Sequence, residues 1–393
     1  MSETAKETGA AEARPKILFV ADGNLLYDEG EFSLLQCARI LESRYDVTRA
    51  HLGNKYRFTD EGLRGFEQIW LFGHANQQEI KGRELETSEL AAIAKFMNAG
   101  GGLFATGDHE DLGSLLCGSI PRVRSMRRWA RNDTPSRGGS NRHDTLRSTT
   151  GRYFHELQAD KLPQEIVPRR FASSGGLALV HPIFRLPNGT IQILPDHTHE
   201  GNCVKPATLT AKYDFGTVKG DEYPALDGVR VGPEILADEM VIGGHPTTEG
   251  GEVFAVTESG VFGAACAWDG HRVKVGRVVT AATWHHFMNV NIMNLLTVPA
   301  YKQAIEAYYR NIALWLDPPP RQMARIAEGF EAALRRYPLA EVPPAGDPSD
   351  ARRALAIGVT TRLLLEALEP HITATLLAGL PAYDPFGARV AET

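Results

Sequence analysis

The stretch Asn98-Ala-Gly-Gly-Gly-Leu-Phe-Ala-Thr-Gly-Asp-His-Glu-Asp-Leu-Gly113 decides the predicted fold. Its glycines precede four residues, 103–106, that suit a buried strand, and four ionisable residues follow almost directly: Asp108, His109, Glu110 and Asp111. In an open parallel sheet, ligands bind in the crevice beyond the carboxyl ends of the strands. The stretch therefore predicts one strand of such a sheet with a functional loop after it.

Segments typical of strands and helices alternate around this stretch. Apolar runs at 16–21, 46–52 and 66–72 predict strands before it. Apolar residues at helical spacing predict helices at 33–43, with Ser33 as a cap, and at 87–97, with Gly100 just past its end. Further strands are expected at 189–195, 253–257, 264–268 and 273–282, and a helix at 300–316. The alternation predicts a mostly parallel sheet with helices on both faces.

Composition narrows the class of protein. The chain has 393 residues, of which 43% are hydrophobic and 23% charged, as in soluble globular proteins. Its net charge of -6 argues against a nucleic-acid binder. No apolar run approaches the roughly 20 residues that a membrane span requires. Four scattered cysteines favour a reducing cytoplasm over a disulfide framework. No nucleotide cofactor is indicated.

Three parts are expected along the chain: a disordered leader at 1–14, an α/β domain at 15–317, and a helical extension at 318–393 after a run of prolines. The extension carries no cluster of catalytic groups, and we expect it to cap the domain or to mediate homo-oligomer formation. Residues 121–147 hold eight arginines and two acids. They form either a mobile flap that brings Arg127 and Arg128 over an anionic substrate, or a solvated insertion whose arginines pair with acids elsewhere.

Ionisable residues follow several of the predicted strands. Because the carboxyl ends of parallel strands meet at one edge of a sheet, we expect these residues to gather there. Six of the thirteen histidines are among them, which makes chance placement a poor account. The set comprises Asp22, His74, Asp108, His109, His197, His199, Glu200, His285 and His286.

Three kinds of chemistry could use this edge. One divalent ion, zinc, manganese or iron, could be held by His197 and His199, which share one side of an extended segment, with Asp108 and His109. Such an ion would activate water for hydrolysis. Acid/base catalysis without a metal could instead pair His285 or His286 with Asp108 or Glu110. The third possibility is a polar pocket that binds a sugar or another polar ligand without catalysis.

Several motifs together carry a family resemblance: residues 100–105, His181-Pro-Ile183, Asp221-Glu-Tyr223, Ala267-Trp268, Gly276-Arg-Val-Val279 and Thr283-Trp-His285. Through them the chain, over residues 16–316, resembles the class I glutamine amidotransferase-like superfamily and, within it, the ThuA-like (trehalose utilisation) family. The resemblance implies a flavodoxin-like three-layer α/β/α sandwich with a pocket at the strand ends. It also implies that His285 is the family histidine.

The chain departs from true amidotransferases in two ways. They carry a cysteine at the elbow after the central strand and a His-x-Glu near a later strand, whereas this chain has Gly107-Asp108 and His285-His286-Phe287. Glutamine hydrolysis is therefore not expected. We expect a hydrolase acting on a sugar or another small, polar or anionic molecule, or else a catalytically silent binding or scaffolding protein. The expected catalytic residues are Asp108, His109, Glu110 and His285, and the expected substrate contacts are Asp22, His74, Glu200, His286, Arg127 and Arg128.

Overall fold

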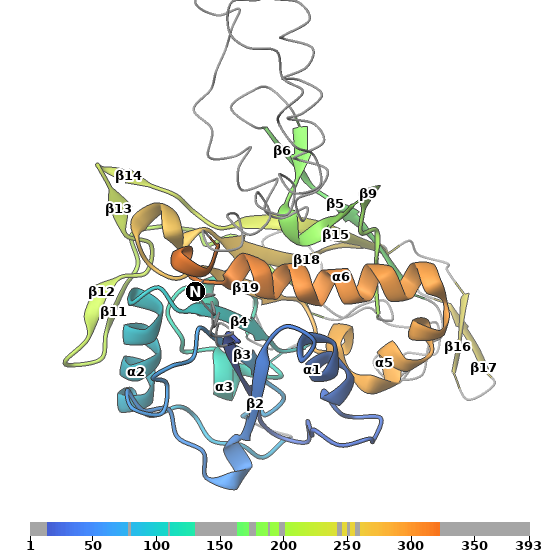
Figure 1. Cartoon of the computed structure of the whole chain (residues 1–393), viewed down its shortest axis with the longest axis horizontal. Helices are drawn as coiled ribbons and strands as arrows, with labels where there is room; N and C mark the ends of the chain where they lie inside the picture. The colour runs from blue at the N-terminus through green and yellow to red at the C-terminus, as the bar shows by residue number, and fades with distance from the viewer. Residues whose placement is uncertain are drawn as a thin grey trace, which may run out of the picture.

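The computed structural model describes residues 14–77, 80–108, 111–129, 163–172, 178–187, 189–195, 201–241, 246–249, 252–255 and 260–322. In this part the chain builds a nine-stranded sheet in the order β10-β5-β15-β18-β19-β4-β3-β1-β2 (Figure 1). Its strands are β1 (Lys16–Ala21), β2 (Asp46–His51), β3 (Gln68–Phe72), β4 (Gly102–Thr106), β5 (Gln164–Pro168), β10 (Ile193–Leu194), β15 (Glu234–Val241), β18 (Gly260–Trp268) and β19 (Val278–Ala281).

Two halves make up this sheet. The strands β2, β1, β3, β4 and β19 pair in parallel, and β18, β15, β5 and β10 continue the sheet with antiparallel pairs. The sheet is therefore mixed, and the mostly parallel sheet that the sequence predicts is confirmed only for its core. Every residue of β3 and β4 is buried, because strands covered on both faces must be apolar on both sides.

Helices pack against both faces of the parallel half. The helices are α1 (Leu35–Leu41), α2 (Thr87–Asn98), α3 (Ser114–Cys117), α4 (Val123–Met126), α5 (Asn289–Met293) and α6 (Pro299–Leu316). Phe19 and Trp70 belong to one hydrophobic core together with residues of α1 and α6. Leu18 and Ile69 belong to a second core together with residues of α2 and α3. Figure 1 shows α6 lying across the sheet, parallel to its face.

Small two-stranded ribbons decorate the sheet. They are β6 (Arg170–Ala172) with β7 (Ala178–Val180), β8 (Arg185–Leu186) with β9 (Gly189–Thr190), β11 (Lys212–Asp214) with β12 (Lys219–Asp221), β13 (Ala225–Leu226) with β14 (Val229–Arg230), and β16 (Pro246–Glu249) with β17 (Glu252–Ala255). The single strand expected at 189–195 is wrong. The chain divides there because β9 closes a ribbon with β8, whereas β10 pairs with β5.

One other boundary differs from expectation. The strand expected at 273–282 begins only at Val278, because Gly270–Val273 form a 3-10 turn that ends at Lys274 in the left-handed region, with φ of 63°. The helix expected from residue 87 does begin there. Glu86 and Glu89 form a capping box at this end.

Several predictions fall on residues outside the described part: the leader at 1–13, His109, Glu110, most of the arginine-rich segment, His197, His199, Glu200, and the extension from 323 to 393. Homo-oligomer formation through that extension stays a prediction. Among the residues that the structure describes, none of the helices has the length and apolar character that would let it cross a membrane.

Candidate functional site

Four neighbouring strands deliver ionisable side chains to one edge of the sheet. The strands β1, β3, β4 and β19 are adjacent and parallel, and their last residues lie opposite one another in register. Asp22 follows β1, His74 follows β3, Asp108 follows β4, and His285 and His286 follow β19. The structure therefore brings together these five of the residues that the sequence places at strand ends.

The centre of this edge is a buried chain of polar groups. Thr283 Oγ1 donates a hydrogen bond of 2.6 Å to Asp108 Oδ1 and accepts one of 2.9 Å from the backbone N–H of His285. The other carboxylate oxygen, Asp108 Oδ2, lies 3.7 Å from His285 Nε2. On the far side of the ring, His285 Nδ1 is 3.1 Å from Asn291 Oδ1. Asp108, Thr283 and His285 have no solvent exposure, so these groups are desolvated together.

The partners of His285 fix its orientation. With Asn291 Oδ1 as the acceptor, His285 Nδ1 carries the proton, because an amide oxygen cannot donate. His285 Nε2 then faces the Asp108 carboxylate with its lone pair or its second proton. This is the arrangement that an imidazole needs to take up a proton and be stabilised by a carboxylate.

His286, the next residue, is in a different state. Burial, with a smaller effect from the nearby His285, lowers the pKa of His286 to about 3. Its imidazole is therefore neutral at pH 7. The backbone carbonyl of His286 accepts a hydrogen bond from the hydroxyl of Tyr309 on α6, which fixes this turn to the helix.

Asp22 lies at the same edge in a strongly desolvated position. Its Oδ1 accepts hydrogen bonds from the backbone N–H groups of His74, at 2.5 Å, and Ala75, at 2.9 Å. Its Oδ2 is buried and has no hydrogen-bond partner within the described residues. Burial raises the pKa of Asp22 to about 6, although the two backbone bonds oppose the shift. A carboxyl group of this kind holds its proton close to neutral pH and can act as an acid there.

The raised pKa of Asp22 predicts a pH-dependent stability. Asp22 binds its proton more tightly in the folded state than in the unfolded chain. Its contribution to the stability of the fold is therefore fully present below pH 3.8 and is lost as the pH rises through about 6. Relative to Asp22→Asn, the wild-type free energy of unfolding should fall by about 3 kcal/mol across that window. Urea unfolding at a series of pH values measures it, with Asp46→Asn, an exposed carboxylate, as the control. Parallel pH profiles for wild type and Asp22→Asn would contradict the raised pKa.

Of the two arginines expected as substrate contacts, Arg127 is held by the protein itself. The Arg127 guanidinium donates to the backbone carbonyls of Asp108 and Ala282, and it stacks 4.5 Å from the ring of Trp129. Arg127 is only 1% exposed, and Arg128 is also buried. Arg127 thus joins the loop after β4 to the end of β19. It is neither a solvated surface arginine nor the tip of a flap.

A second arginine cluster holds the chain before Arg127 and was not foreseen. The buried carboxylate of Glu222 accepts hydrogen bonds from Arg124 Nε at 2.6 Å and from the backbone N–H of Arg122 at 3.1 Å. The Arg122 guanidinium donates to the Glu222 carbonyl and lies 5.0 Å from the ring of Trp268. Arg122 has a φ of 71°, which is costly for a side chain of its size, and these contacts hold it there.

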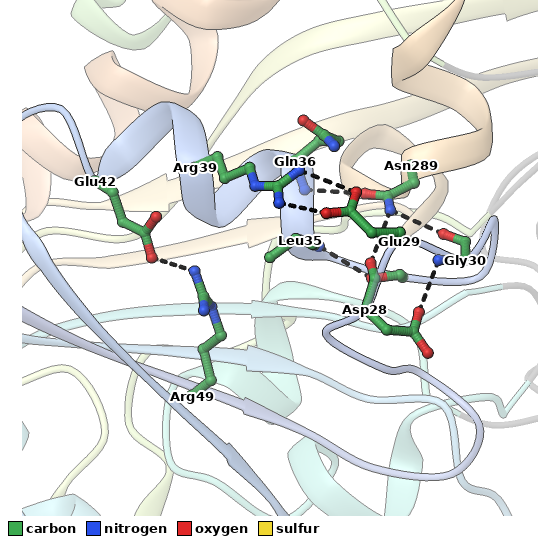
Figure 2. Close-up of polar contacts among 10 residues, drawn as sticks. Asp28, Glu29, Gly30, Leu35, Gln36, Arg39, Glu42, Arg49 and Asn289 are labelled. Atoms are coloured by element: carbon green, nitrogen blue, oxygen red, sulfur yellow. Dashed lines mark hydrogen bonds and ion pairs between the residues drawn. The ribbon is translucent and has the colours of Figure 1, made fainter.

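The loop after β1 is tied to the segment that carries His285. Asn289 Nδ2 donates to the carbonyls of Asp28 and Gly30, at 3.2 and 2.8 Å, and Asn289 Oδ1 accepts from the N–H of Gln36 at 2.9 Å (Figure 2). Asn289 therefore caps the first turn of α1 from a distant part of the chain. Ser33, the expected cap, accepts a longer bond of 3.2 Å at its Oγ from the N–H of Leu35.

The described residues do not form a metal site by themselves. Within this part of the chain, no group of three or more histidine, cysteine, aspartate or glutamate side chains is arranged to hold an ion. Of the four ligands expected from the sequence, only Asp108 is described. A metal site at this edge would depend on His109, His197 and His199.

Comparisons with known proteins do not name a family. No protein-family model matches the chain, and no curated protein matches it in sequence. The mmIFT52 N-terminal domain is similar in structure with a TM-score of 0.37 and 12% identity, over 76% of this chain and 97% of that one. A cytoplasmic protein from Salmonella typhimurium, STM3548, has a TM-score of 0.35 and 10% identity, over 77% of this chain and 99% of that one. Likenesses this weak assign neither fold nor function.

Proposed function

We propose that this chain is a ThuA-like hydrolase that acts on a sugar or another small polar molecule. The strand order β2-β1-β3-β4-β19 of its parallel half supports a flavodoxin-like arrangement, in which five parallel strands follow the order 2-1-3-4-5. The observation that carries the proposal is the buried pair of Asp108 and His285, 3.7 Å apart at the carboxyl edge of the sheet. Asp108 also accepts a hydrogen bond from Thr283, and His285 is also hydrogen-bonded to Asn291. Both contacts support the proposal.

The pair can perform general acid/base catalysis. His285 Nε2 would take a proton from water as its oxygen attacks the substrate, and the Asp108 carboxylate would stabilise the resulting imidazolium. His285 would then return the proton to the leaving group, so the proton count balances over one turnover. Proton transfer by a positioned side chain typically contributes 10²–10⁴-fold to a rate. Nothing in this sequence of steps requires Asp108 to leave its bond with Thr283.

Complete burial of the pair sets a condition on this reaction. Since neither Asp108 nor His285 is exposed, the covering chain has to open for the substrate to reach them. Closure would then exclude bulk water from the reacting groups and strengthen their electrostatic interaction. The same burial favours the alternative function, a catalytically silent binding or scaffolding protein in which Asp108 and His285 only stabilise the fold.

A panel of chromogenic glycosides and esters, with neutral and anionic sugar groups, tests the proposal. We expect the purified wild-type protein to hydrolyse at least one compound with saturation kinetics. Saturable binding of the same sugars without turnover of any compound would establish the binding function instead. The Asp108→Asn variant then assigns any turnover to this edge.

Metal removal separates the two catalytic versions. We expect turnover to persist after dialysis against a strong chelator, because Asp108 and His285 supply the acid/base groups without an ion. Elemental analysis before and after dialysis verifies that any ion has been removed. Activity that disappears with the ion and returns with zinc, manganese or iron would instead favour the version that depends on His197 and His199.

A further inference from the structure

An open cavity of about 430 Å³ lies beside the strand edge. Its volume is within the range of small-molecule sites. Its described wall comes from residues 76–77 and 80–84, which follow β3, and from α3. The lining residues are Asn76, Gln77, Ile80, Lys81, Gly82, Glu84 and Leu115.

The position of this cavity in the sheet is one where ligands bind. The chain passes from β1 to β2 on one side and then returns to β3 on the other side of β1, so the strand order reverses between β1 and β3. In open α/β sheets the crevice beyond the strand ends at such a point is the usual ligand site. Ile80 connects the cavity to this point, because its Cγ2 would lie 3.0 Å from a Cβ added to Gly23, the residue after Asp22.

Neighbouring contacts hold the wall of the cavity in place. Asn76 Oδ1 accepts a 2.9 Å hydrogen bond from the N–H of Ile80, and Asn76 Nδ2 donates to Asp111 at 3.3 Å. Gly82 packs so closely that an added Cβ would lie 2.2 Å from the Cβ of Ala75. The backbone on both sides of Lys81 is therefore fixed, which lowers the entropy cost of using its side chain for binding.

The charges in the cavity are unevenly satisfied. The Glu84 carboxylate is hydrogen-bonded to the side-chain amide of Gln77. The exposed ammonium group of Lys81, by contrast, forms no ion pair with any residue that the structure describes. A cation that has no ion pair among the described residues can attract an anion in a concave site. The oxygens of Gln77 and Glu84 can accept hydrogen bonds from hydroxyl groups.

We propose that this cavity binds a small polyhydroxylated anion, a sugar acid or sugar phosphate, with Lys81 pairing with its carboxylate or phosphate. The site is new with respect to the Asp108–His285 pair, and only the statement that its ligand is the substrate rests on the proposed function. The ligand's hydroxyl groups bond to Gln77 and Glu84, and its anionic group lies at Lys81. This arrangement restricts the substrate to charged sugars.

Calorimetric binding of three probes tests the site: D-gluconate, glucose 6-phosphate and uncharged D-glucose. We expect one or both anions to bind the wild-type protein more tightly than glucose does. Lys81→Gln should weaken that binding about tenfold, as expected for loss of a charge-assisted hydrogen bond, and Lys81→Arg should retain it. Lys302→Gln, which removes an exposed lysine from α6, is the matched control and should bind as the wild type does. The tighter of the two anions identifies the preferred group.

Equal affinity of the wild type and Lys81→Gln for the anions would overturn the site, and so would anions that bind no better than glucose. Because the measurement is of binding, it does not depend on catalysis. If Asp108→Asn keeps full turnover while Lys81→Gln loses affinity, the catalytic proposal fails and the site stands. If Asp108→Asn abolishes turnover while Lys81→Gln binds normally, the site fails and the catalytic proposal stands.

Discussion

Asp108→Asn is expected to lower kcat/KM for hydrolysis by at least about 100-fold, the lower range for loss of acid/base catalysis. Asparagine has nearly the same shape and can still accept the Thr283 hydroxyl bond of 2.6 Å. It carries no negative charge, however, and so cannot stabilise an imidazolium at His285, 3.7 Å away. The loss should appear mainly in kcat, because the pair acts on the reacting groups and contributes little to holding the ground-state substrate.

Two comparisons make this result specific. Asp60→Asn removes an exposed carboxylate that pairs with Lys95, and it should leave kcat unchanged. His285→Gln should lose activity to a similar extent, and the double variant should lose little more, because the two residues act as one unit. Turnover within a few-fold of wild type in a folded Asp108→Asn protein would remove this pair from the mechanism.

Glu222→Ala is expected to lower the free energy of unfolding by about 1–3 kcal/mol, the cost of leaving a buried hydrogen-bond donor without its acceptor. Glu222 is only 1% exposed, and its carboxylate satisfies Arg124 and the backbone N–H of Arg122. Without it, the buried backbone N–H of Arg122 has lost its acceptor, and the strained backbone at Arg122 loses a restraint. Chemical denaturation of the variant and the wild type at the same pH measures the difference.

The matched control is Glu234→Ala. Glu234 pairs with Lys205 at 2.7 Å, but both side chains are about half exposed, at 51% and 45%. Exposed pairs contribute at most about 1 kcal/mol, so this variant should be nearly as stable as the wild type. Equal effects of the two substitutions would mean that the Glu222 cluster is no more important than an ordinary surface pair.

The sequence predicts the parallel half of the sheet well and the antiparallel half poorly. Each of β1, β3 and β4 is an apolar run that is buried on both faces, a signal that needs no knowledge of the partner strands. By contrast, β15 reads Glu-Ile-Leu-Ala-Asp-Glu-Met-Val, with three acids and residues that also suit a helix. Its pairing with β18 and β5 makes it a strand, and that pairing is not visible locally.

The same division applies to the candidate site. The sequence could place four residues at one edge of the sheet, because each follows an apolar run and parallel strands end at the same edge. They are Asp22, His74, Asp108 and His285. Thr283 and Asn291 could not be given their contacts, because these depend on how the turn after β19 folds. The one available signal was that polar residues interrupt an otherwise apolar segment at 283–291.

The arginine-rich segment shows why charge counts mislead. Counting suggested either a flap or a solvated insertion, since both accommodate many cations. In the described part of the segment, Arg122 and Arg127 are instead buried against aromatic rings and backbone carbonyls. Guanidinium groups can do this because they are planar and weakly hydrated.

The bond from Asn289 to the first turn of α1 also bears on the order in which the protein is made. Gln36 and Asn289 are 253 positions apart, so α1 leaves the ribosome long before its cap exists. The strand β19 lies between β4 and β18 and completes the parallel half of the sheet. It is translated after the other four strands of that half, β1 to β4. Contacts of such long range slow folding and leave nascent surfaces exposed. During synthesis, therefore, the first half of this protein cannot complete its packing until the second half has been translated. We expect chaperones to bind its exposed apolar surface in that interval.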